Sequence, residues 1–161
     1  MGLKFDPQVL EGLAPVLSIR PPLEPPEVGD VDARRDNARR LFAQVLASRP
    51  PVAGVDVERY SVVSDDGTTI PLSWYSRADS TEPGSAVLYI HGGGMIMGLE
   101  ELGDMYESGV RRYVADSGVP MLVVDYRLAP EFPHPVPVQD CYASLLWLAS
   151  HAGELGVDAA R

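Results

Sequence analysis

The chain has 161 residues, of which 45% are hydrophobic and 22% charged, a composition typical of a globular domain with a real core. Its net charge of −10 argues against nucleic acid and anionic membrane surfaces as partners, because both attract Lys and Arg. The single cysteine, Cys141, excludes an intrachain disulfide and suits a reducing compartment. No secretory leader is visible, and no apolar run approaches the ~20 residues of a membrane span. We therefore expect a cytoplasmic protein without a transmembrane segment.

The first fifty residues predict two helices joined by an extended linker. Asp6 can cap a helix that has Pro7 at its first position, and Asp30 can cap a second helix that runs to about Arg49. Residues 21–29 between them read PPLEPPEVG and lack apolar periodicity, which favours an extended chain. Each predicted helix has an apolar face that must be buried. These faces comprise Val9, Leu10, Leu13, Val16 and Leu17 in the first helix and Leu41, Phe42, Val45 and Leu46 in the second.

After residue 56 the pattern changes to strands. Glu58–Val63 and Thr69–Ser76 flank the turn Asp65-Asp66-Gly67, which predicts a β-hairpin. Ala86–Ile90 is a short continuous apolar run, typical of a strand buried on both faces. A helix, a strand and a second helix are then predicted over residues 104–117, Pro120–Val124 and Val138–His151. This alternation predicts an α/β fold with a mostly parallel sheet and covering helices, whose chemistry lies in the loops at the strand ends.

A glycine-rich loop, His91-Gly92-Gly93-Gly94, follows the apolar run Ala86–Ile90 directly. Glycines allow positive φ angles and a close approach of the backbone to a ligand, so such a loop can aim several N–H groups at one point. Donors of this kind stabilise an oxyanion in a transition state. A plain glycine turn at a strand end is the alternative. A phosphate-binding loop is disfavoured because neither G-x-G-x-x-G nor G-x-x-x-x-G-K-[ST] is present.

A second motif follows the strand Pro120–Val124. Residues 125–131 read DYRLAPE, the proline-rich segment FPHPVP occupies residues 132–137, and Asp140 lies on the next predicted helix. The HGGG and DYRLAPE motifs together resemble the esterases of the hormone-sensitive-lipase type, also called bacterial family IV. This resemblance covers essentially the whole chain and implies an α/β-hydrolase fold. It implies that residues 1–50 are N-terminal cap helices and that residues 51–161 are the N-terminal half of the hydrolase core.

The resemblance also assigns roles within the glycine-rich loop. It implies that the N–H groups of Gly93 and Gly94 point into the oxyanion hole, that Gly92 lets the loop turn, and that His91 supports the loop by hydrogen bonding. The family usually has an aromatic residue after the glycines, where this chain has Met95, and this changes the expected shape of the acyl pocket. The implied reaction is ester hydrolysis by a serine nucleophile on a small-molecule ester, without a metal or an organic cofactor.

The family's GDSAG nucleophile motif is missing from this sequence, as is any G-x-S-x-G. Ser108 and Ser117 lack the motif and lie on or near a predicted helix, whereas a nucleophile needs a sharp turn between a strand and a helix. We therefore expect the nucleophile and the rest of the triad beyond Arg161, and we expect the 161-residue chain alone to be inactive. Its predicted partner is the C-terminal half of the same fold, and a homodimer is left open. Two alternatives are a non-catalytic receptor of the gibberellin-receptor type and a half-chain that is complemented by another chain.

Several other polar residues are candidates for functional sites. His134, His151 and Cys141 do not have metal-ligand spacing, so we expect packing or surface roles for them. Arg127 can pair with Asp140 or stay solvated, and the sequence favours neither. Cys141 is predicted to be a small core residue on the apolar face of the last helix. That face comprises Val138, Cys141, Tyr142, Leu145, Leu148 and Ala149.

Overall fold

A computed structural model describes residues 5–19, 25–46, 50–79 and 84–160, and the chain divides into two compact units, residues 1–50 and 51–161. The first unit contains helices α1 (Pro7–Ile19) and α2 (Val31–Leu46). Both predicted caps are confirmed. Asp6 Oδ1 accepts a hydrogen bond from the Gln8 N–H at 2.8 Å, and Asp30 Oδ1 accepts one from the Ala33 N–H at 2.9 Å. The predicted continuation of α2 to Arg49 and part of the linker lie outside the described residues.

The predicted apolar face of α1 is largely uncovered within the described residues. Val9, Leu10 and Leu13 are 49%, 44% and 37% exposed. On α2, Leu41, Phe42 and Leu46 are partly buried. The side chains of Val16, Leu17 and Val45, which were also predicted to face inward, lie outside the described part of the chain.

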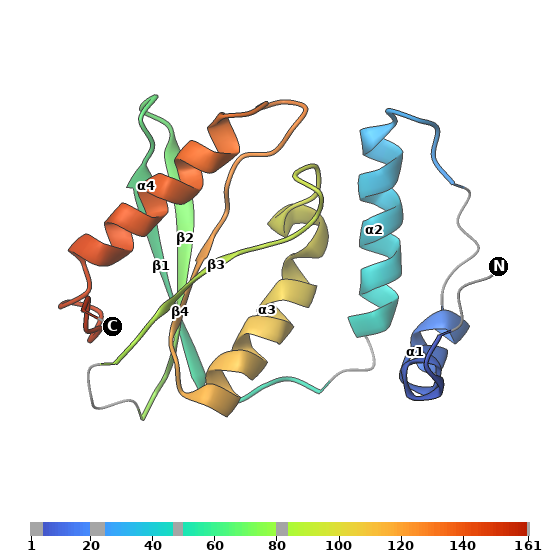
Figure 1. The fold of residues 1–161 in the computed structure, drawn as a ribbon, viewed down its shortest axis with the longest axis horizontal. Helices are drawn as coiled ribbons and strands as arrows, with labels where there is room; N and C mark the ends of the chain where they lie inside the picture. Colours follow the sequence, from blue (N-terminus) through green and yellow to red (C-terminus); the bar gives the residue numbers. More distant parts are fainter. Residues whose placement is uncertain (1–4, 20–24, 47–49, 80–83, 161) are drawn as a thin grey trace. The chain divides into compact units, whose positions relative to one another are not determined.

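The second unit is built on a four-stranded sheet in the order β1-β2-β4-β3 (Figure 1). The strands are β1 (Val55–Val63), β2 (Thr69–Arg77), β3 (Val87–Ile90) and β4 (Met121–Val124). β1 pairs with β2 and β2 pairs with β4 in the antiparallel sense, as expected for a hairpin whose second strand joins the sheet. β3 and β4 are parallel. Among the described strands, parallel pairing is therefore limited to β3 and β4, and the sheet is more mixed than predicted.

The remaining two helices cover opposite faces of the sheet (Figure 1). They are α3 (Leu99–Ser117) and α4 (Val136–Ser150). All four residues of β4 are buried, because its side chains alternate between a core cluster that includes α3 and another that includes α4. α3 begins five residues earlier than predicted. Its first turn is fixed by the buried carboxylate of Glu101, which accepts a hydrogen bond from the Gly98 N–H at 2.8 Å.

β3 lies beside β4 at the edge of the described sheet. The prediction that this strand is buried on both faces is wrong, because Val87 is 39% exposed and Ile90 is 53% exposed. An edge strand has a neighbour on one side only, which leaves its side chains less covered than those of β4. Beyond β3, the described residues contain a single parallel bridge between Gly84 and Val157, next to which the Asp158 N–H donates to the Gly84 carbonyl at 2.9 Å.

The buried face of α4 differs from the predicted apolar stripe. The helix buries Leu148 as expected, but it also buries Pro137 and the polar residues Asp140 and Ser144. Because these polar side chains are hydrogen-bonded, they can occupy the buried face of the helix. Part of the predicted apolar face is therefore exposed to solvent. The residues that we call the α4 surface are each about half exposed. The α4 surface comprises Val138, Tyr142, Leu145 and Leu146.

Arg127 and Asp140 form a buried ion pair, which confirms one of the two arrangements that the sequence left open. Arg127 Nη2 lies 2.7 Å from Asp140 Oδ1, Arg127 Nε lies 2.9 Å from Oδ2, and the Asp140 side chain is fully buried. Ser64 donates a third hydrogen bond to Asp140 at 2.8 Å. Arg127 Nη1 also contacts Asp66 in the turn of the hairpin at 2.6 Å. The pair thus joins the segment after β4 to the start of α4 and to the β1–β2 turn.

We predict that Asp140→Asn destabilises the protein by about 3–5 kcal/mol, because it leaves the Arg127 guanidinium without its buried partner. Burial alone would raise the pKa of Asp140, but hydrogen bonds from Arg127 and Ser64 outweigh burial and hold that pKa below its usual 3.8. A carboxylate with a lowered pKa contributes stability that is present above pH 3.8 and lost as the pH falls below it. The free energy of unfolding in urea, measured for both proteins at pH 7 and below pH 4, tests the effect of the substitution and the pH dependence.

The matched control is Asp79→Asn, because Asp79 pairs with Arg77 at 2.6 Å on the surface, where its side chain is 68% exposed. An exposed pair is strongly screened, so this variant should unfold at nearly the same urea concentration as the parent protein. Equal stability losses in the two variants would contradict the special role of the buried pair.

Candidate functional site

The glycine-rich loop lies at the carboxyl end of β3. The parallel register pairs Ile90 of β3 with Val124 of β4, so His91 and Asp125 leave the sheet at the same end. The two sequence motifs therefore emerge side by side, although they are far apart in the chain. A backbone hydrogen bond also links the two motifs, because the Ala129 N–H donates to the Met95 carbonyl at 2.9 Å. The carboxyl end of parallel strands is where α/β folds place their binding loops.

The loop takes a backbone path that requires glycine. Gly93 and Gly94 have φ angles of 121° and 64°, and Met95, which follows them, has a φ of 62°. A Cβ atom on Gly93 would lie 2.1 Å from the Met97 carbonyl oxygen, so no larger residue fits there without moving the loop. The Met97 N–H donates back to the Gly93 carbonyl at 3.1 Å and closes the turn. The N–H groups of Gly93 and Gly94 therefore lie on two successive peptides of this turn.

Within the described residues, neither the Gly93 N–H nor the Gly94 N–H is paired with an acceptor. Gly93 is partly exposed and Gly94 is exposed, so both donors are at or near the surface of the loop. Backbone donors left open on a loop whose shape is held by internal hydrogen bonds can bind an anionic oxygen.

His91 is buried at the base of the loop, with 2% of its surface exposed. Its Nδ1 lies 2.8 Å from the Gly92 carbonyl oxygen, and because that oxygen can only accept, Nδ1 carries the proton. Nε2 is buried and has no hydrogen-bond partner among the described residues. Burial lowers the pKa of His91 below 6.5, against an opposing effect of the Gly92 hydrogen bond. His91 is therefore neutral at neutral pH and acts as a donor to its own loop.

Two tyrosines surround His91 and were not singled out from the sequence. Tyr126 lies in the DYRLAPE motif, and its hydroxyl donates to the His91 carbonyl at 2.7 Å. Tyr106 comes from α3 and packs against the His91 ring at 5.5 Å between ring centroids. For Tyr126, the available signal in the sequence was its position next to Arg127 in the DYRLAPE motif. Nothing in the sequence pattern marks Tyr106, because its contact with His91 depends on how α3 packs.

Ser108, Ser117 and Ser150 do not lie at this loop. Ser108 lies within α3, and Ser117 closes the end of that helix by donating to the Tyr113 carbonyl at 2.6 Å. Ser150 Oγ and His151 Nδ1 are 3.0 Å apart, but this pair lies at the end of α4, which returns to the opposite end of the sheet. Ser117 therefore helps to close a helix end, and none of these three serines is positioned by the glycine-rich loop.

Other polar groups that the sequence raised as candidates lie in packing or surface positions. His151 stacks on Trp147 with 4.3 Å between ring centroids, and His134 is exposed. Cys141 is partly buried, and burial raises the pKa of its thiol to about 11, which keeps it protonated and unreactive. Among the described residues, no three His, Cys, Asp or Glu side chains come together as metal ligands, and no described helix is long and apolar enough to span a membrane.

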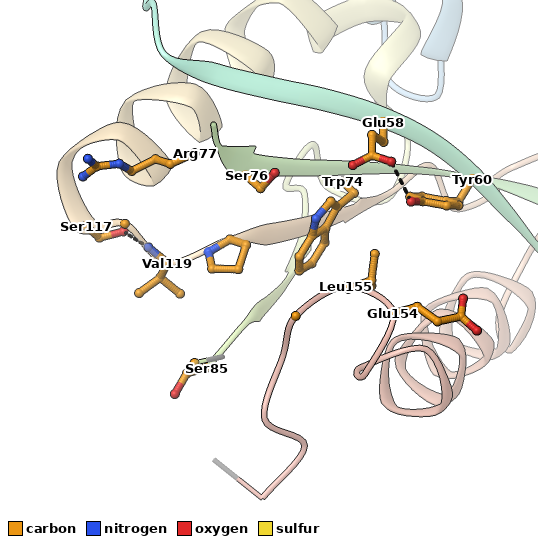
Figure 2. A pocket seen from close by; sticks show the side chains of 14 residues that line it. Glu58, Tyr60, Trp74, Ser76, Arg77, Ser85, Ser117, Val119, Glu154 and Leu155 are labelled. Carbon is orange, nitrogen blue, oxygen red and sulfur yellow. Dashed lines mark hydrogen bonds between the residues drawn. The ribbon is translucent and has the colours of Figure 1, made fainter. Parts of the chain in front are cut away.

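A cavity of about 370 Å³ lies at the end of the sheet opposite the glycine-rich loop (Figure 2). Trp74 lines it together with Glu58, Tyr60 and Arg77, and Glu58 accepts a hydrogen bond from the Tyr60 hydroxyl at 2.9 Å. Its serines include Ser117, whose oxygen accepts a hydrogen bond from the Val119 N–H at 3.1 Å. This cavity is therefore separate from the candidate site.

We predict that the protein loses stability as the pH falls below 6.5, because the folded state holds His91 neutral while the unfolded chain binds a proton there. His91→Asn, in which an amide nitrogen can take the place of Nδ1, should flatten this part of the stability profile. Urea unfolding between pH 7.5 and 5 gives the slope. His134→Asn is the control, and a slope that changes equally in both variants would show that His91 is not the group responsible.

The chain is similar to known hydrolases in both sequence and structure. Residues 87–161 match a family described as having the alpha/beta hydrolase fold. The ethyl acetate hydrolase of Pseudomonas putida is 34% identical over 130 residues, which cover 78% of this chain and 40% of that protein. Esterase LipI of Mycobacterium tuberculosis is 32% identical over 131 residues, covering 81% of this chain and 39% of that protein.

The solved structure of a bacterial heroin esterase superposes with a TM-score of 0.75 at 31% identity, covering 92% of this chain and 45% of that one. The chain spans about 40% of the length of the curated relatives it matches. The resemblance to esterases that was predicted from the HGGG and DYRLAPE motifs is thus confirmed. The family match over residues 87–161 and the superposition on a solved esterase show that the chain has the α/β-hydrolase fold, of which it covers about half.

Proposed function

We propose that this chain supplies the oxyanion-hole loop of a carboxylic ester hydrolase of the hormone-sensitive-lipase type. The observation that carries the proposal is the loop after β3, in which Gly93 and Gly94 present two unpaired backbone donors on a path closed by internal hydrogen bonds. Esterase relatives of the same fold support it. In this proposal Gly92 allows the turn and His91 supports it through its hydrogen bond to the Gly92 carbonyl.

The proposed reaction is acyl transfer through a serine that residues outside 1–161 contribute. Attack of the serine hydroxyl on a small ester produces a tetrahedral intermediate, whose oxyanion accepts hydrogen bonds from Gly93 and Gly94. Collapse releases the alcohol and leaves an acyl-enzyme, which water then hydrolyses. The loss of one such donor typically costs about 10²–10³ in kcat. No step requires a metal or an organic cofactor.

The structure offers two surfaces for the part of the protein that would carry the serine. One is the open edge of β3, where Val87 and Ile90 are partly exposed. The other is the α4 surface, whose four apolar side chains are each about half exposed. We propose that the C-terminal half of the fold covers both, and we call the chain completed in this way, in one polypeptide or by co-expression, the assembled hydrolase.

We further propose that residues 1–50 form a cap for the ester site. The proposal rests on the family resemblance and on the apolar residues Val9, Leu10 and Leu13, which recur at helical spacing along α1. Met95 is 42% exposed beside the two donors and would line the acyl pocket with a flexible side chain. The free thiol of Cys141 is compatible with a cytoplasmic location. A non-catalytic receptor would bind an ester without turnover, which an activity assay distinguishes.

We predict that Gly93→Ala lowers the kcat of the assembled hydrolase about 10²-fold or more with little change in KM. The added Cβ would meet the Met97 carbonyl oxygen at 2.1 Å, so the loop must reopen and its donors must move. Gly94→Ala should be milder, about tenfold, because its Cβ meets nothing within 4 Å and only the positive φ angle of 64° is costly. Steady-state hydrolysis of p-nitrophenyl esters measures both.

Gly109→Ala is the matched control, since Gly109 lies in α3 with open space around its Cβ position. It should leave kcat unchanged. Equal kcat values for all three variants, with only KM raised in the loop variants, would rule out the oxyanion role and leave a role in substrate binding.

We also predict that residues 1–161 alone have no esterase activity and associate with themselves or with a complementary chain. Donors without a nucleophile lack the covalent step, and the open apolar edge of β3 invites pairing with another strand. Val87→Lys places a charge on this edge and should shift the chain toward the monomer. Light scattering gives the solution mass, and p-nitrophenyl ester hydrolysis gives the activity.

Two results would contradict this prediction. A soluble parent chain that is monomeric and melts cooperatively would refute the association. Turnover that a serine-directed inhibitor abolishes would refute the absence of a nucleophile.

A further inference from the structure

His91, the first residue of the glycine-rich loop, is held by two tyrosines from different elements. Tyr126 follows β4 directly, and Tyr106 lies in the middle of α3. Each tyrosine contacts the His91 ring and also the backbone of the loop. These contacts matter because the direction of the loop's N–H groups depends on how firmly its first peptide is fixed.

Tyr126 contacts His91 in two ways. Its ring stacks on the imidazole with 4.2 Å between centroids and 11° between planes. Its hydroxyl reaches past the ring and donates to the His91 carbonyl at 2.7 Å. Tyr126 is 6% exposed, so this hydrogen bond is shielded from water and is worth more than one on the surface. One residue thus fixes both the side chain and the backbone of His91.

Tyr106 adds a contact with the next residue of the loop. Its ring lies 5.5 Å from the His91 ring at 41°, and Tyr89 of β3 packs against it at 6.1 Å. The Tyr106 hydroxyl oxygen would be 3.1 Å from a Cβ atom on Gly92, so the tyrosine rests directly on that glycine. His91 therefore has ring contacts from both α3 and the segment after β4.

The His91 imidazole, fixed by these contacts, orients the peptide between Gly92 and Gly93. His91 Nδ1 donates to the Gly92 carbonyl at 2.8 Å, and the Gly92 carbonyl shares its peptide plane with the Gly93 N–H. In a trans peptide these two groups point in opposite directions. Because the Gly92 carbonyl points toward His91, the Gly93 N–H points away from His91. In the proposed function, this is the side on which a substrate oxygen would bind.

We propose that Tyr126 is a positioning residue for the oxyanion loop, which acts with Tyr106 by holding His91 so that the Gly92–Gly93 peptide keeps its orientation. The inference rests on the proposed function for its catalytic meaning, because the loop geometry alone does not require a reaction. Tyr126 touches neither donor and acts through His91. A Tyr-to-Phe change isolates the hydroxyl, since the ring stack remains.

The experiment compares Tyr126→Phe with Tyr113→Phe, a control on α3 whose tyrosine is 53% exposed. In the assembled hydrolase, Tyr126→Phe should lower kcat roughly three- to tenfold, the effect of one net hydrogen bond on the population of the competent loop, and change KM less than twofold. Tyr106→Phe should act in the same direction. Hydrogen exchange of residues 91–97, followed by mass spectrometry, should become faster in Tyr126→Phe and not in Tyr113→Phe.

The two readouts separate the failure of this inference from the failure of the proposed function. An inactive parent hydrolase would refute the proposed function, while loop exchange would still test whether Tyr126 holds the loop. An active parent in which Tyr126→Phe matches Tyr113→Phe in kcat and in exchange would overturn the inference. A lower kcat with unchanged loop exchange would also overturn it, because the tyrosine would then act by another route.

Discussion

The ion pair between Arg127 and the fully buried Asp140 fixes the segment on which the candidate site depends. It joins the chain that leaves β4 to the N-terminal part of α4, and through Asp66 it also joins the β1–β2 turn. A buried charge pair of this kind has little tolerance for displacement, because a shift of either partner leaves a charge without compensation. The residue just before Arg127 is Tyr126, so the same constraint sets where the Tyr126 ring lies.

A short series of contacts connects this ion pair to the glycine-rich loop. Tyr126 stacks on His91 and binds its carbonyl, and His91 binds the carbonyl of Gly92. The Ala129 N–H fixes the far side of the loop through the Met95 carbonyl at 2.9 Å. The loop is therefore supported from the DYRLAPE segment at both ends, which gives a physical reason for the two motifs to occur together. A preorganised donor pair of this kind spends little free energy on rearrangement during reaction.

Local signals in the sequence were sufficient for some elements and not for others. The β1–β2 hairpin follows from the Asp65–Gly67 turn, and the caps of α1 and α2 follow from single aspartates. The start of α3 was missed because a buried glutamate, Glu101, defines it. The buried face of α4 was misplaced because buried Asp140 depends on Arg127 from another element. The tyrosine contacts with His91 and the exposure of β3 depend on tertiary packing and strand order, which periodicity does not encode.

The central claim is that Gly93 and Gly94 donate to the oxyanion of an ester in its transition state. The most direct test is a crystal structure of the assembled hydrolase with a phosphonate bound to its nucleophilic serine. The account predicts a phosphonate oxygen about 2.7–3.1 Å from both the Gly93 and Gly94 nitrogens, with the Gly92 carbonyl still bound by His91. A phosphonate oxygen that points away from both glycines, toward other donors or solvent, would contradict it.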